Sequence, residues 1–232
     1  MTCGTNEIDE AGPPTGGSLR TPKAAAIAGI VFAILLIAIF VLLRSALPGS
    51  PTEAGEWLSH DVWRAALALN FIPVAGIAFL WFIGVLRDRL GAKEDRFFAT
   101  VFFGSSLLFL GLIFTAAALI GALILVGAMI GPAALAGTST FHLARAAAFI
   151  LVNFYAAKVA VVFMISTSTV LIRTGIVPRW IALFGYVLAL VLLIGSYFVT
   201  WTIVVLPVWV LLISVSILID NLRERKNHSR LD

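Results

Sequence analysis

The chain has 232 residues, of which 61% are hydrophobic and only 12% are charged, and its mean hydropathy is +1.06. Soluble globular domains carry about 25% charged residues, so this composition excludes a soluble globular protein and predicts an all-α, polytopic membrane protein. The net charge of +4 does not indicate nucleic-acid binding, because the basic residues follow the predicted membrane boundaries.

The first segment, 1–23, is polar and rich in Gly, Pro and Thr. It lacks the apolar core of a secretory signal peptide, so the first apolar run after it is predicted to be a retained membrane anchor. We expect 1–23 to be a disordered cytoplasmic tail. Its single cysteine, Cys3, is the only one in the chain and therefore excludes an intrachain disulfide bond.

Apolar runs then predict six transmembrane helices, because about 20 apolar residues cross a bilayer. The predicted helices are 24–46, 63–86, 97–129, 142–172, 180–198 and 202–220. The third and fourth are longer than a bilayer requires, so they must tilt or project from it. Residues 180–219 contain no charge and are long enough for two spans, and we place the break between them near Ser196–Thr202. The predicted domains are thus the tail 1–23, a six-helix transmembrane domain at 24–220, and a basic cytoplasmic tail at 221–232.

The distribution of Lys and Arg predicts that both termini are cytoplasmic. In that orientation twelve of the 16 basic residues lie on the inner side, whereas the external loop 47–62 carries three acidic residues. Inner loops of membrane proteins are enriched in Lys and Arg. The inner residues are Arg20, Lys23, Arg87, Arg89, Lys93, Arg96, Arg173, Arg179, Arg223, Arg225, Lys226 and Arg230.

Small residues at a spacing of four predict close contacts between helices. Ala25 and Gly29 form one such pair, and Ala117 and Gly121 form another. We interpret both pairs as packing within the chain, with the seam of a homodimer as the alternative.

Lys158 is the most informative single residue, because it lies midway between His142 and Arg173, roughly 23 Å from either end of its predicted helix. A cation at that depth costs about 3 kcal/mol and is a functional candidate by default. On a regular α-helix, Tyr155, Ser166 and Thr169 share its face. These four side chains are predicted to form one polar stripe.

Two asparagines complete the predicted ligand-binding set of Lys158, Tyr155, Thr169, Ser166, Asn70 and Asn153. Asn153 lies on the opposite face of the fourth helix, with Arg145, which we expect to extend towards the outer interface. Asn70 precedes Pro73 by three residues. It either contacts a ligand or compensates for the backbone hydrogen bond that the proline removes.

The chain contains no metal-binding Cys/His spacing, no phosphate-binding loop, and no GxSxG or HExxH motif. We therefore expect no cofactor, no metal site and no catalytic residues.

Three stretches carry a resemblance: NFIPVAGIAFLWFIGVLRDRLGAKEDRFFATVFFGSSLLFL, STSTVLIRTGIVPRWIALFGY and LPVWVLLISVSIL. They resemble small multispan membrane proteins of high-GC bacteria, over most of the chain after residue 55. That group has no assigned activity, so the resemblance implies a bacterial cytoplasmic membrane but no function and no site.

Two functional hypotheses follow. In the first, the protein binds a lipid or a small amphipathic or anionic ligand within its helix bundle, as a transporter or accessory component. In the second, it is a structural subunit or assembly factor of a larger membrane complex. The expected partners are the bilayer and its anionic lipids, which suit the C-terminal RERKNHSR run, and either a membrane protein or a second copy of the chain.

Overall fold

The computed structural model describes residues 22–47, 55, 57–90, 96–196 and 202–228, and this part of the chain is helical with no β-strand. The all-α prediction is therefore confirmed. The elements are α1 (Pro22–Ala46), α2 (Trp57–His60), α3 (Val62–Leu90), α4 (Arg96–Ile130), α5 (Pro132–Ala136), α6 (Ser139–Ile150), a π-helix (Leu151–Ala156), α7 (Ala157–Thr174), α8 (Arg179–Gly195), a 3₁₀ turn (Thr202–Val204) and α9 (Val205–His228).

Five segments of the described chain are long and apolar enough to cross a membrane. They are Ala26–Ala46, Val62–Arg87, Phe97–Ile130, Ser139–Thr174 and Thr202–Arg223. Helix α8 is apolar but shorter, at 17 residues. The chain is thus a multi-pass membrane protein, and the predicted helix positions agree closely with the observed ones.

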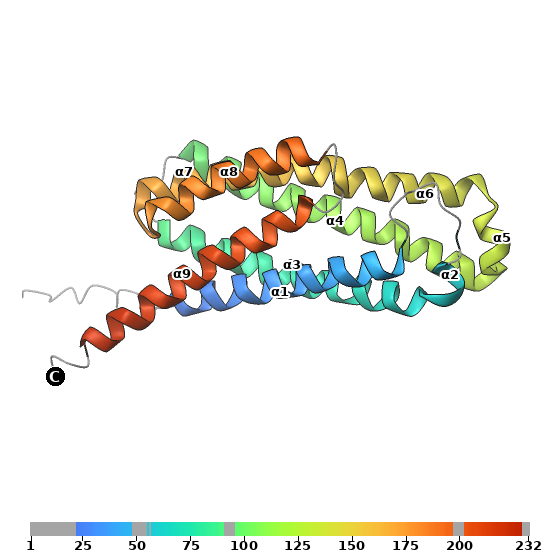
Figure 1. Cartoon of the computed structure of the whole chain (residues 1–232), viewed down its shortest axis with the longest axis horizontal. Helices are drawn as coiled ribbons and strands as arrows, with labels where there is room; N and C mark the ends of the chain where they lie inside the picture. The colour runs from blue at the N-terminus through green and yellow to red at the C-terminus, as the bar shows by residue number, and fades with distance from the viewer. Residues whose placement is uncertain (1–21, 48–54, 56, 91–95, 197–201, 229–232) are drawn as a thin grey trace, which may run out of the picture.

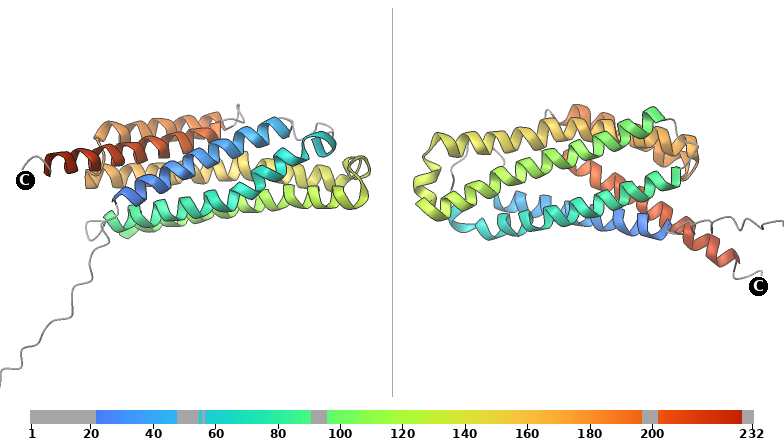
Figure 2. Two further views of the ribbon diagram at one scale, coloured as in Figure 1. Left: turned by 90° about the horizontal axis from the view of Figure 1, so that it is seen from below. Right: turned by 180° about the vertical axis from the view of Figure 1, so that it is seen from behind.

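The helices form an elongated bundle whose two halves contain different sets of helices (Figures 1 and 2). Helices α1, α3 and α4 and the continuous α6–α7 rod run along most of its length, and α2 and α5 lie at one end. The α8–α9 hairpin accompanies them over the opposite half only, and α9 continues beyond the bundle. Near the α2/α5 end the bundle therefore has four long helices, without α8 or α9.

Both ends of the described chain lie at the same end of the bundle, since α1 begins and α9 finishes away from α2 and α5 (Figure 1). The predicted tail 1–23 falls almost entirely outside the described residues. At the other terminus, α9 continues to His228, so most of the predicted basic tail is helical. The predicted hairpin break also falls largely outside the described residues, between Ser196 and Thr202.

Aromatic side chains in the core hold the long helices together. The ring of Phe79 on α3 stacks on Phe32 of α1 at 4.3 Å and meets Phe163 of α7 edge-on at 5.3 Å. Phe163 in turn stacks on Phe102 of α4 at 5.5 Å and meets Trp209 of α9 at 6.4 Å. These contacts link five helices, and ring pairs of this kind add about 0.5–1.5 kcal/mol each beyond the area that they bury.

Of the predicted small-residue pairs, the first marks a close approach and the second does not. A Cβ at Gly29 would collide with the Ser214 hydroxyl and lie 2.7 Å from Cδ2 of Phe82. Gly29 thus brings α1 against α3 and α9 within one chain. A Cβ at Gly121 would meet only Leu69, at 3.7 Å, which is ordinary van der Waals contact.

The rod that contains Lys158 is not a regular α-helix. Its central segment, Leu151–Ala156, is a π-helix between α6 and α7. A π turn holds one more residue than an α turn, so it rotates α6 relative to α7 by roughly 100°, the angle between successive residues of an α-helix. Face assignments made on one regular helix therefore do not carry from α6 to α7.

Candidate functional site

A cavity of about 190 Å³ lies among α1, α3, α4 and the α6–π segment, next to the 3₁₀ turn that precedes α9. Its wall is formed by the C-terminal half of α1, by α3, α4 and the α6–π segment, and by the 3₁₀ turn. The lining residues are Leu36, Ile39, Phe40, Leu43, Arg44, Leu47, Leu69, Ile72, Ile113, Ala116, Ala117, Ile120, Arg145, Ala148, Phe149, Val152, Asn153, Ile203 and Val204. All of them are apolar except Arg44, Arg145 and Asn153.

Arg145 is the most unusual residue of the cavity wall, because its side chain is only 4% exposed. Its guanidinium carbon lies 5.8 Å from the centroid of the Trp57 ring, and Trp57 is itself buried. The guanidinium thus lies beside α2, at the expected outer end of the bundle, but it is buried there and not exposed at an interface. The physical reason is that α2 packs its buried Trp57 against this part of α6 and covers the arginine.

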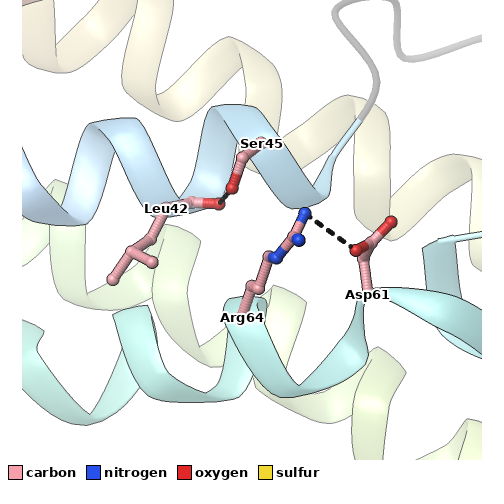
Figure 3. Close-up of polar contacts among 4 residues, drawn as sticks. All are labelled: Leu42, Ser45, Asp61 and Arg64. Atoms are coloured by element: carbon pink, nitrogen blue, oxygen red, sulfur yellow. Dashed lines mark hydrogen bonds and ion pairs between the residues drawn. The ribbon is translucent and has the colours of Figure 1, made fainter.

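Two side chains of the cavity wall are cationic. Arg44, in the last turn of α1, supplies a second guanidinium, and none of the described residues that line the cavity is acidic. The carboxylate of Asp61, the residue directly before α3, forms an ion pair with Arg64 at 3.0 Å (Figure 3). In the same view the Ser45 hydroxyl donates to the carbonyl of Leu42 in its own helix.

Asn153 is the one residue of the predicted set that lines the cavity. It belongs to the π-helix, and its Nδ2 donates a hydrogen bond of 3.0 Å to the carbonyl of Phe149, one turn earlier. The side-chain amide of Asn153 thus donates to a carbonyl of its own helix and also adds a polar group to the cavity wall, next to Arg145 in the lining.

The predicted polar stripe does not converge on the cavity. Lys158 is half-buried on α7 and is not a lining residue, and Tyr155 is 59% exposed. The Ser166 hydroxyl is buried and donates to the carbonyls of Val162 and Phe163, at 2.9 and 3.0 Å. Such bonds to a residue's own helix are common for serine and threonine, so Ser166 has a structural role here.

Thr169 makes a contact between helices. Its hydroxyl donates to the Ile165 carbonyl at 2.9 Å and lies 2.7 Å from the Tyr186 hydroxyl of α8. This pair joins α7 to α8, away from the cavity.

Asn70 lies on the outside of α3. Its side chain is exposed, and its Nδ2 donates to the carbonyl of Ala66 at 2.8 Å. Pro73 leaves the carbonyl of Leu69 without its usual backbone donor. Asn70 does not compensate for this loss, because its side chain donates to Ala66 instead. The neighbour Leu69, and not Asn70, lines the cavity.

Sequence reasoning missed Arg44 as a lining residue and did not foresee that Arg145 is buried. The shared helix face of Arg145 and Asn153 was a usable signal, since both line the cavity. Nothing local in the sequence associates Arg44 with them, because Arg44 is about 100 residues away in the chain and reaches the cavity only through the packing of α1.

The described residues contain no group of three His, Cys, Asp or Glu side chains placed to hold a metal ion. The chain matches no protein-family model, no curated protein and no solved structure.

Proposed function

We propose that this chain is a membrane protein of the bacterial cytoplasmic membrane that binds an amphipathic anion in the cavity beside Arg145, as a transporter or an accessory component. The observation that carries the proposal is the side chain of Arg145, 4% exposed, in the wall of an otherwise largely apolar cavity.

The chemistry of this wall suits an anion with an apolar part. An arginine cannot lose its proton in a protein, and placing a charge within a bilayer costs about 3 kcal/mol or more. Intramembrane charges therefore mark ligand sites by default. Ligand cavities are typically apolar with a few placed polar groups, and a guanidinium matches carboxylate and phosphate groups in geometry.

The proposal includes six spans and cytoplasmic termini. Helix α8 has 17 residues and is about 26 Å long, close to the roughly 30 Å of a hydrocarbon core. Arg87 and Arg173 support a cytoplasmic interface at the end of the bundle opposite α2 and α5. Their guanidinium carbons lie over the rings of Phe103 and Phe98, at 5.2 and 4.7 Å.

Native mass spectrometry of the full chain, released from its own membrane, tests the proposal. We expect the wild type to retain an anionic amphipath and Arg145→Gln to lose most of it. Lys158→Met is the matched control, because it also removes an intramembrane cation but lies outside the cavity wall. Retention by the control and loss by Arg145→Gln would support the cavity as the site.

Two other outcomes would contradict the proposal. If only Lys158→Met lost the bound amphipath, the ligand site would be the polar stripe around Lys158 that the sequence predicted, and not the cavity. Recovery of a stoichiometric membrane protein without any amphipath would favour the structural-subunit hypothesis. If Arg145→Gln fails to fold, Arg44→Gln serves instead, because Arg44 is exposed and lines the same cavity.

A further inference from the structure

We infer that the ligand of this cavity is a single-chain amphipathic anion, with its head between Arg44 and Arg145 and its chain directed towards the middle of the bundle. The inference rests on the proposed function and specifies the class of ligand.

The position of the head follows from where the two arginines lie. Arg44 is in the last turn of α1 and Arg145 is in the second turn of α6. Both of these helix ends lie towards the α2/α5 end of the bundle (Figure 1). Two guanidinium groups at one end of a cavity suit the charge and geometry of a carboxylate or phosphate head.

The direction of the ligand's alkyl chain follows from the other residues of the cavity wall. Leu36 lies eight residues before Arg44 on α1, about 12 Å further into the bundle. Ile72 of α3 and Ile113 of α4 are further apolar residues of this wall. An alkyl chain in this space avoids water without burying any polar group.

The α8–α9 hairpin defines the deep end of the space. Ile203 and Val204, in the turn before α9, contribute to the lining. The hairpin reaches only half of the bundle's length (Figure 2), and beyond the level at which it ends the core is formed by Trp57, Leu135 and Phe141. The cavity occupies that level, so the hairpin turn limits how far a chain can enter.

The volume restricts the ligand to one chain. At about 190 Å³ the cavity is slightly larger than the roughly 150 Å³ that holds one benzene molecule. It is smaller than the 300 Å³ or so at which drug-sized pockets begin. One short alkyl chain fits this space, whereas the two chains of a phospholipid do not fit together.

The test measures binding of decanoate, decanol and decyltrimethylammonium to the full chain in phosphatidylcholine nanodiscs, by native mass spectrometry and titration calorimetry. We expect saturable binding of one decanoate, at least about tenfold tighter than decanol, because a hydrogen bond to a charged group contributes about 1.5–3 kcal/mol. We expect no saturable binding of the cationic probe.

Two variants separate the head from the chain. Arg145→Gln should weaken decanoate about tenfold or more and leave decanol unchanged. Ala117→Phe should weaken both, because Ala117 lines the cavity and a phenyl ring there fills it. Ala118→Phe is the matched control, since Ala118 is exposed on the same helix and outside the lining. Should Arg145→Gln not fold, Arg44→Gln provides the head variant.

The failures are distinguishable. If phosphatidylglycerol binds and is lost in Arg145→Gln while decanoate does not bind, the ligand class is wrong and the proposed function stands. If decanoate binds to Ala117→Phe as tightly as to the wild type, the alkyl chain of decanoate does not occupy the cavity and the inference is overturned. If no anionic amphipath binds at all, the proposed function itself fails.

Discussion

At the scale of single residues, two features shape this bundle: the buried cation Arg145, and glycines at helix contacts. Arg145 contributes charge to the cavity and packs over Trp57. Gly29 and Gly185 contribute space. A Cβ at Gly185 would collide with the Ser168 hydroxyl and lie 2.7 Å from Nε1 of Trp209. Small residues matter in membranes because helix association there depends on close packing.

This closeness predicts that Gly29→Ala destabilises the protein. The new methyl group would overlap Ser214 and the buried ring of Phe82, and overpacking of a core typically costs about 1–3 kcal/mol. Thermal unfolding in detergent, followed by circular dichroism, measures the effect. Gly84→Ala is the control, because nothing lies within 4 Å of a Cβ there. Equal midpoints for the two variants would show that α1 does not approach α9 closely.

At the scale of elements, the π-helix lies between the segment that lines the cavity and the helix that carries Lys158. Arg145 lies before it, Asn153 lies within it, and Lys158 lies after it. The extra residue of the π turn rotates α6 relative to α7. Arg145 and Asn153 line the cavity in this arrangement, whereas Lys158 does not.

Deleting Tyr155 should convert the π turn into a regular α turn and rotate α6 by roughly 100° relative to α7. We expect the deletion to lower the midpoint of thermal unfolding, because Arg145 would lose its contact with Trp57 and face lipid, at a cost of about 3 kcal/mol. Tyr155→Ala is the control, because it removes an exposed side chain and keeps the residue count. If both variants lower the midpoint equally, the side chain matters and the register does not.

The α8–α9 hairpin determines which half of the bundle has two additional helices in its core. It accompanies only one half of the bundle (Figures 1 and 2), so the core at the other half depends on a second buried cluster. That cluster includes Trp57, Leu58, Leu135 and Phe141. The cavity lies between the two halves because neither the hairpin nor this cluster fills the space at that level.

At the scale of the whole molecule, the positions of the charged residues bear on the proposed orientation of the chain in the membrane. The described start of α1 and end of α9 share one end of the bundle with Arg173 and Arg179 (Figure 1). The opposite end holds α2, α5 and the ion pair of Asp61 with Arg64. This arrangement is consistent with basic residues facing the cytoplasm.

Labelling with a membrane-impermeant maleimide tests this orientation in intact cells. The natural Cys3 should react only after the membrane is permeabilised. In a Cys3→Ser background, Ser139→Cys should react in intact cells, whereas Pro178→Cys should require permeabilisation. Both positions are exposed and lie at opposite ends of the bundle. The reverse pattern would invert the topology, and reaction of both cysteines in intact cells would exclude the proposed arrangement.

Much of the fold could be predicted from local sequence. The runs at 24–46, 63–86 and 97–129 match α1, α3 and α4 within a few residues, because an apolar stretch in a bilayer must satisfy its own backbone and does so as a helix. The site was predicted less well. Of the predicted ligand-binding residues only Asn153 lines the cavity.

The sequence by itself determined that this is an all-helical, multi-pass membrane protein, and where its helices begin and end, because hydrophobicity and backbone hydrogen bonding act over a few neighbouring residues. Only the tertiary structure decided which polar side chains share a cavity. Its wall combines Arg44 of α1, Arg145 of α6 and Ile203 of the turn before α9, segments far apart in the chain.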